Sequence, residues 1–191
     1  EEAFELYGIF QFICAGAFMS GSGNTDLYGP EHLIEKDVVV VTINYRYSAF
    51  GFLSTKDENA PGNAGLKDIR LALEWVQKNI EKFGGDKNKV TVFGHSAGSA
   101  ATDYLLISES TKGLFHQAIL QSGSSFMPCH FVPDPKAQAE ILAQKLGITF
   151  TDNKDLIEKL QAVPYEDIMN VESMLFSMGY PWALRPFEFS P

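Results

Sequence analysis

Continuous apolar runs of strand length recur along the first 125 residues of this chain. Four of them stand out: 7–14 (YGIFQFIC), 37–45 (DVVVVTINY), 89–95 (KVTVFGH) and 116–122 (HQAILQS). The first two are nearly unbroken, as is typical of strands that a parallel sheet buries on both faces. The run at 37–45 is the clearest of the four and predicts a buried strand.

Helical spacing of apolar residues fills the intervals between these runs. After residue 65 one apolar stripe recurs at three- and four-residue steps, at Leu66, Ile69, Leu73, Val76 and Ile80. Gly84 and Gly85 are expected to end this helix, because glycine accepts the left-handed conformation found just past a last turn. Further helices are expected from Pro30 and over 97–108. This alternation predicts an α/β fold, a mostly parallel sheet with crossover helices.

The remaining segments have a different character. Residues 46–65 are rich in Gly, Asn and Ser and predict a loop. After residue 125 the pattern predicts helices, at 134–147, 152–161 and 165–175. No linker separates the two parts. We therefore expect residues 1–191 to form one domain, with a sheet core over 1–125 and a helical region over 126–191.

Charge and cysteine content exclude several classes of partner. The chain has 15 basic and 24 acidic residues, a net charge of −9, which repels nucleic acid and anionic lipid surfaces. The cysteines, Cys14 and Cys129, give neither a disulfide framework nor a zinc-site spacing with the four histidines. No apolar run approaches the ~20 residues of a membrane-spanning helix, so no transmembrane segment is predicted. Localisation and oligomeric state stay open.

One motif suggests nucleophilic chemistry. In VTVFGHSAGSAATDYLL (91–107), Ser96 lies in a Gly-x-Ser-x-Gly turn that a strand enters and a helix leaves. This context matches the nucleophile elbow, a strained turn whose flanking glycines permit close packing and expose the serine hydroxyl. The helix that follows points its first N–H groups at the same place, so the N–H of Ala97 is a candidate donor to an oxyanion.

A second set of donors is expected from another small-residue loop that follows a strand. The segment ICAGAFMSGSG (13–23) fits this description. A glycine-rich turn without chemistry is an equally good interpretation of the segment taken alone. A phosphate-binding loop is a poorer one, because no Lys-Ser or Lys-Thr pair follows and the net charge is negative.

Activation of Ser96 requires a base. The order serine, acid, histidine leaves Asp103 or Glu109 as the acid, followed by His116 or His130. Asp103 lies about two helical turns, ~10 Å, from Ser96, which is too far to orient a histidine there. Side chains next to each other on such a turn diverge, so we expect His95 to support Ser96 as a neighbour and not to serve as its base. The position of His116 at the start of the predicted strand 116–122 favours a structural role for this residue.

The sequence resembles the type B carboxylesterase family, the cholinesterase-like branch of the α/β-hydrolases. The resemblance rests on consecutive blocks: AGAF…GSG, VTINYRYSAFGFLST, GNAGLKDIRLALEWVQKNIEKFGGDKNKVTVFGHSAG and GLFHQAILQSG. Together they cover about residues 8–191 in unbroken order, and GHSAG is similar to insect α-esterases in particular. The resemblance implies a partial α/β-hydrolase fold.

The same resemblance implies hydrolysis of small carboxylic esters through an acyl-serine intermediate. Ser96 matches the nucleophile of the family, and Gly16, Ala17 and Ala97 match the amides of its oxyanion hole. It implies neither a metal nor an organic cofactor. The acid and the histidine of the family come from later segments, so we expect them beyond residue 191.

The chain departs from the family pattern at three points. Cys14 and Ala15 stand where the family usually has His or Tyr and then Gly. If that glycine had a positive φ, the Cβ of Ala15 would strain the backbone and distort the hole. The third departure is length, because family members have several hundred residues. The competing hypothesis is a non-catalytic relative, either a truncated protein that sequesters apolar esters or an adhesion-type module.

Overall fold

The computed structural model describes residues 6–127 and 132–177. The chain forms two compact units: Glu1–Tyr45 with Leu66–Met127, and Arg46–Gly65 with Pro128–Pro191. We call them the sheet unit and the helical unit and describe each by itself. The helices expected after residue 126 belong to the helical unit, together with residues 46–65.

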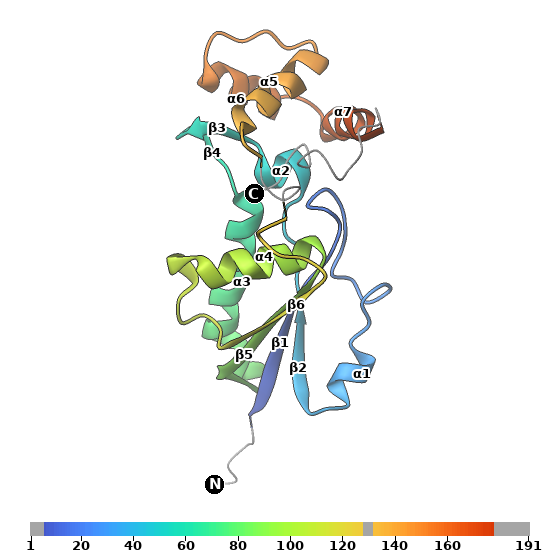
Figure 1. Cartoon of the computed structure of the whole chain (residues 1–191), viewed down its shortest axis with the longest axis vertical. Helices are drawn as coiled ribbons and strands as arrows, with labels where there is room; N and C mark the ends of the chain where they lie inside the picture. Colours follow the sequence, from blue (N-terminus) through green and yellow to red (C-terminus); the bar gives the residue numbers. More distant parts are fainter. Residues whose placement is uncertain (1–5, 128–131, 178–191) are drawn as a thin grey trace. The chain divides into compact units, whose positions relative to one another are not determined.

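A four-stranded parallel sheet forms the sheet unit, in the order β2-β1-β5-β6 (Figure 1). The strands are β1 (Tyr7–Ile13), β2 (Val38–Thr42), β5 (Gly85–His95) and β6 (Gln117–Gln121). In register, Phe12 of β1 lies opposite Thr42 of β2 and Phe93 of β5. Parallel neighbours require crossovers, and the helices between the strands supply them. The predicted α/β class is confirmed.

The crossover helices are α1 (Glu31–Ile34), α3 (Ala64–Asn79) and α4 (Ala97–Ile107). The α3 helix continues into a 3₁₀ turn, η1 (Ile80–Phe83), and Gly84 ends it in the left-handed conformation with φ 78°, as the sequence predicts. Gly85 does not belong to this helix end but begins β5, four residues before the expected start at residue 89. A second 3₁₀ turn, η2 (Glu109–Thr111), precedes β6.

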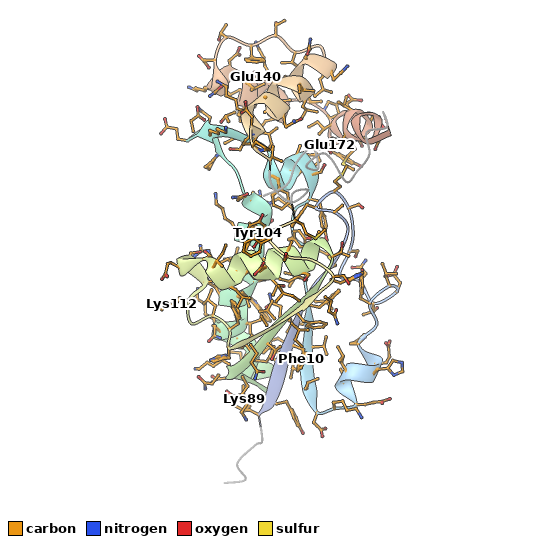
Figure 2. The ribbon with its side chains drawn as sticks, viewed as in Figure 1. Phe10, Lys89, Tyr104, Lys112, Glu140 and Glu172 are labelled. Carbon is orange, nitrogen blue, oxygen red and sulfur yellow. The ribbon has the colours of Figure 1, made fainter. Side chains whose placement is uncertain are left out.

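The two faces of the sheet are filled differently. Ile9 and Ile13 of β1 are fully buried on one face, beside Val90 and Val92 of β5. On the other face, aromatic rings pack together: Phe12 lies 4.9 Å from Phe93 and 4.6 Å from Tyr28, and Phe10 lies 5.8 Å from Phe93 (centroid distances; Phe10 is labelled in Figure 2). These two layers form the core that carries the carboxyl ends of β1 and β5.

A polar residue, Gln11, interrupts the aliphatic layer. It lies between Ile9 and Ile13 on the same face of β1, its neighbours in register are Val41 and Val92, and it is fully buried. Neither its amide nitrogen nor its oxygen has a hydrogen-bond partner among the described residues. A buried amide without partners destabilises a fold by about 1–3 kcal/mol.

The strand expected at 37–45 is shorter and less buried than its apolar run suggests. It spans Val38–Thr42, lies at one edge of the sheet and is half-buried along its length. Ile43, Asn44 and Tyr45 follow the strand and do not belong to it. They lie where β2 ends, beside the end of β1.

The helical unit corrects the prediction of a loop over 46–65. This segment contains the helix α2 (Ser48–Phe52) and a small hairpin of β3 (Ser54–Asp57) and β4 (Ala60–Pro61). The buried carboxylate of Glu172 accepts a hydrogen bond of 2.7 Å from the Ala49 N–H in the first turn of α2 (Glu172 is labelled in Figure 2). No local pattern predicts this bond, because its partners are 123 residues apart.

Three helices complete the helical unit: α5 (Pro135–Lys145), α6 (Asn153–Gln161) and α7 (Tyr165–Ser177). Asp57 at the end of β3 joins the hairpin to α6, since it accepts a 2.8 Å hydrogen bond from Asn153 Nδ2. It also accepts hydrogen bonds from Thr55 and from the backbone N–H of Asn59. These bonds, that of Thr55 foremost, hold the pKa of Asp57 well below its ordinary value.

Over the described residues, the chain has no helix that is long and apolar enough to span a membrane.

Candidate active site

Ser96 occupies the turn between the end of β5 and the start of α4. Its backbone has a positive φ, with φ 55° and ψ −119°, a conformation that strains a residue with a Cβ. Two backbone hydrogen bonds fix the turn: the Ser96 N–H donates to the Gln121 carbonyl (2.8 Å), and the Ser96 carbonyl accepts from the Ala100 N–H (3.1 Å). Among the described residues, the Ser96 hydroxyl has no hydrogen-bond partner, and the side chain is half-buried.

The glycines on either side of Ser96 are required by close backbone contacts. A Cβ on Gly94 would lie 2.1 Å from the Gly98 carbonyl oxygen, and one on Gly98 would lie 2.0 Å from that of Ile13 and 2.6 Å from that of Cys14. No side chain fits at either place. The first turn of α4 therefore lies directly against the end of β1, where the loop over 14–23 begins.

The segment after β6 supports the same turn from the other side. A Cβ on Gly123 would lie 2.2 Å from the Ser96 carbonyl oxygen, and Ser99 Oγ donates to the Gly123 carbonyl (2.7 Å). Asp103 accepts hydrogen bonds from both the N–H (2.8 Å) and the hydroxyl (2.7 Å) of Ser125. Asp103, which the order serine, acid, histidine allows as a triad acid, thus holds the segment after β6.

The loop over residues 14–23, which we call the β1 loop, contains three consecutive residues of positive φ. Gly16 has φ 126°, and Ala17 and Phe18 have φ 57° and 62°. Ala15 is not among the residues with positive φ, so the condition under which its Cβ would strain the loop is not met. The turn begins at Gly16, whose carbonyl accepts from the N–H groups of Met19 (2.9 Å) and Ser20 (3.1 Å). Ala17 and Phe18 are the residues between these hydrogen-bonded ends.

Three backbone N–H groups, those of Ala97, Gly16 and Ala17, have no acceptor among the described residues. Ala97 begins α4, so its N–H has no acceptor within the helix, and the N-terminal end of the helix dipole favours negative charge. The N–H groups of Gly16 and Ala17 donate to no other described residue. The contact of Gly98 with the Cys14 carbonyl brings the start of the β1 loop to this helix end. Their role as oxyanion donors stays a prediction.

The histidines are placed as follows. His95 ends β5 in register with Gln121 and is exposed. No hydrogen bond joins it to Ser96 within the described chain, and its supporting role stays a prediction. His116 makes two hydrogen bonds to Val90: its Nδ1 accepts from the Val90 N–H (3.2 Å), and its backbone N–H donates to the Val90 carbonyl (2.8 Å). This arrangement is structural. His130 and Cys129 lie outside the described residues.

Sequence reasoning missed two residues that contact the β1 loop. The Tyr45 hydroxyl donates to the Cys14 carbonyl (3.2 Å), and Asn44 Oδ1 accepts from the Gly23 N–H (2.8 Å). The only signal in the sequence was that two polar side chains end the apolar run at 37–45.

Similarity to known proteins extends over nearly the whole chain. The model of the carboxylesterase family matches residues 3–187. Juvenile hormone esterase of Heliothis virescens is 44% identical over 189 residues, 97% of this chain and 33% of that protein. Cholinesterase 2 of Branchiostoma lanceolatum is 39% identical over 187 residues, 96% of this chain and 54% of that protein.

A solved structure is similar over nearly the whole chain. It is the crystal structure of juvenile hormone esterase from Manduca sexta with OTFP covalently attached, with a TM-score of 0.87 and 40% identity. The match covers 97% of this chain and 36% of that one. The chain therefore spans about a third to a half of the length of these relatives.

Proposed function

Because the chain belongs to the carboxylesterase family, we propose that it carries the nucleophile and the oxyanion hole of a carboxylic ester hydrolase. Ser96 Oγ attacks the ester carbonyl carbon and gives a tetrahedral intermediate. The N–H groups of Gly16, Ala17 and Ala97 hold the negative oxygen. The alcohol leaves with a proton, and water then releases the acid from the acyl-serine and restores the Ser96 hydroxyl.

The observation that supports this most directly is the backbone at Ser96. A serine with φ 55° is strained, and strain of this kind is typical of sites where a side chain must be presented. The strained residue stands at a helix N-terminus, and Gly98 lies against the carbonyl of Cys14, where the β1 loop begins. The solved relative with a covalently attached molecule is in line with a covalent mechanism.

The base and the acid of this mechanism are not assigned to residues 1–191. Asp103 is engaged by Ser125 and His116 by Val90. We propose, as the resemblance to the family implies, that the histidine and the acid come from polypeptide beyond residue 191. A serine without its base reacts slowly, and loss of a triad member lowers the rate by several orders of magnitude.

The test is labelling with a fluorophosphonate, which reacts with activated serines. The protein is taken from its natural source and its intact mass is measured before and after the probe. A labelled species heavier than the 21.2 kDa of these 191 residues, with the adduct on Ser96, supports the proposal. Recombinant protein of the same length as the labelled natural species, carrying Ser96→Ala, should not be labelled. The matched control is Ser110→Ala, at an exposed serine after α4, which should be labelled normally.

The competing function is binding of apolar esters without hydrolysis. It is favoured by the Ser96 hydroxyl, which has no hydrogen-bond partner among the described residues. An unlabelled species of 21.2 kDa that retains an ester ligand would support this function. The strained backbone at Ser96 argues against an adhesion-type module, because a surface that only binds another protein has no need of it.

A further inference from the structure

We infer that Asn44 and Tyr45, the residues just after β2, are positioning residues that hold the β1 loop in the shape that presents the N–H groups of Gly16 and Ala17. This inference rests on the proposed function, because it assigns to these two side chains the geometry of the oxyanion hole. Neither side chain is proposed to touch the ester.

The first anchor is at the entry to the β1 loop. The Tyr45 hydroxyl donates a 3.2 Å hydrogen bond to the Cys14 carbonyl, and both residues are buried, with 3% and 0% of their surface exposed. Cys14 directly follows β1, and its carbonyl also lies against Gly98 of α4. The bond from Tyr45 therefore fixes the point from which the loop departs, next to the turn that carries Ser96.

The second anchor is at the far end of the loop. Gly23 is buried and its N–H donates a 2.8 Å hydrogen bond to Asn44 Oδ1. A Cβ on Gly23 would lie 2.5 Å from the Ile43 carbonyl oxygen, so the loop ends in direct backbone contact with the segment after β2. The anchoring side chain of Asn44 and the contacted backbone of Ile43 belong to adjacent residues, and both fix the loop at Gly23.

The stretch between the anchors needs this support. Gly16, Ala17 and Phe18 all have positive φ, and a non-glycine residue in such a conformation is strained and persists only when its surroundings impose it. Within the loop, the Gly16 carbonyl accepts from Met19 and Ser20. Release of either end would let Ala17 and Phe18 relax toward negative φ, which would turn the neighbouring N–H groups away from the oxyanion.

The sheet explains why both anchors come from one place. Because β1 and β2 are parallel and in register, with Phe12 opposite Thr42, they end at the same edge of the sheet. The residues after Thr42 therefore arrive beside the residues after Ile13. A short polar segment at this position reaches both ends of the β1 loop.

The experiment uses the full-length protein, produced recombinantly, and compares Tyr45→Phe, Asn44→Ala and Asn44→Asp with wild type in ester hydrolysis. Oxyanion contacts act on the transition state, and small misplacements lower rates strongly. We expect kcat to fall about tenfold in Tyr45→Phe and Asn44→Ala, with KM within about twofold of wild type. Asn44→Asp keeps an acceptor for the Gly23 N–H and should retain wild-type kcat.

The control is Thr111→Val, which removes another buried hydroxyl of the sheet unit. Thr111, the last residue of η2, donates to the carbonyls of Leu105 in α4 and of Ser108, and its hydroxyl makes no hydrogen bond to the β1 loop. It should lower the melting temperature as Tyr45→Phe does and leave kcat unchanged. Unchanged kcat in Tyr45→Phe and Asn44→Ala would overturn the inference, as would a loss in Asn44→Asp equal to that in Asn44→Ala.

Hydrogen exchange separates this inference from the proposed function. The N–H groups of Met19 and Ser20, which donate to the Gly16 carbonyl, should exchange at least tenfold faster in Tyr45→Phe and Asn44→Ala than in wild type or Asn44→Asp. If the wild-type protein hydrolyses no ester, the proposed function fails while this exchange pattern still supports the anchoring of the loop. Equal exchange in all variants would overturn the anchoring, whatever the activity.

Discussion

The elbow at residues 94–98 and the β1 loop at 14–23 follow neighbouring parallel strands, and both contain residues of positive φ. They are held in different ways. Main-chain atoms fix the elbow, through the contacts of Gly94 and Gly98 and the bond from Ser96 to Gln121. The β1 loop also depends on two side chains that lie 21 and 31 residues away in the chain.

This difference determines how each segment tolerates mutation. In the elbow, any added side chain meets backbone that cannot move without displacing a strand. In the β1 loop, the anchors are neutral hydrogen bonds that can be removed one at a time while the fold is kept. We therefore expect elbow variants to lose stability and reactivity together, and β1-loop variants to lose reactivity first.

The largest expected effect is that of Gly98→Ala. Its Cβ would lie 2.0 Å from the Ile13 carbonyl oxygen, so α4 and β1 must separate. We expect the free energy of unfolding to fall by about 3 kcal/mol or more and fluorophosphonate labelling to be lost. Denaturant unfolding and intact mass measure the two effects. In the control Gly113→Ala, nothing lies within 4 Å of the Cβ but φ is 80°, so only a loss of about 1 kcal/mol is expected. Wild-type stability in Gly98→Ala would contradict the main-chain account of the elbow.

The next effect concerns β1, the strand that carries the β1 loop. Gln11→Leu replaces a buried amide without described partners by an apolar side chain of similar size. We expect the free energy of unfolding to rise by about 1–2 kcal/mol, with the labelling rate of Ser96 unchanged. Denaturant unfolding and labelling kinetics test whether the stability of β1 and the shape of its loop are separate properties. A stabilised variant with altered labelling would show that they are not.

The smallest effect is expected at Asp57, which anchors the hairpin of the helical unit. This anchor is charged, whereas the anchors of the β1 loop, Asn44 and Tyr45, are neutral. The hydrogen bonds to Asp57, that of Thr55 first, lower its pKa from the ordinary value of 3.8. A lowered pKa in the folded state gives stability that is fully present above pH 3.8 and is lost as the pH falls through the folded value. Asp57→Asn should lower the melting temperature by a few degrees at pH 7 and by less below pH 3.8.

The matched comparison for Asp57→Asn is Asn44→Ala, whose effect on the melting temperature should not change over the same pH range. Thermal melts between pH 7 and pH 3 give both curves. A pH-independent effect of Asp57→Asn would show that its carboxylate charge does not contribute to the hairpin.

The same difference explains what the sequence predicted and what it did not. The elbow was predicted because its constraints are local: Gly94, Ser96 and Gly98 lie within five residues and between a strand and a helix. The position of the β1 loop was predicted from its small residues, but strain was considered only for Ala15, whereas the non-glycine residues of positive φ are Ala17 and Phe18. Nothing in the local sequence shows which carbonyl closes the turn.

Longer-range contacts account for the remaining differences. Residues 46–65 contain turn-forming residues and predict a loop, yet α2 forms there with its first turn bonded to Glu172. The run at 37–45 predicts a buried strand, but its place at a sheet edge leaves it half-buried. By contrast, α5 was predicted with its start, because Asp134 and Pro135 form a cap that is local in the chain.

The place of β1 in the middle of the sheet has a consequence for the order of folding. Ile9 pairs with Val39 on one side and with Val90 on the other, so the sheet closes only when segments far apart in the chain have met. Pairings of this kind form slowly. Until these pairings form, Gly98 of α4 cannot pack on the carbonyls at the end of β1, and Tyr45 cannot hydrogen-bond to the start of the β1 loop. An emerging chain would therefore acquire the strained turn at Ser96 only with the completed sheet.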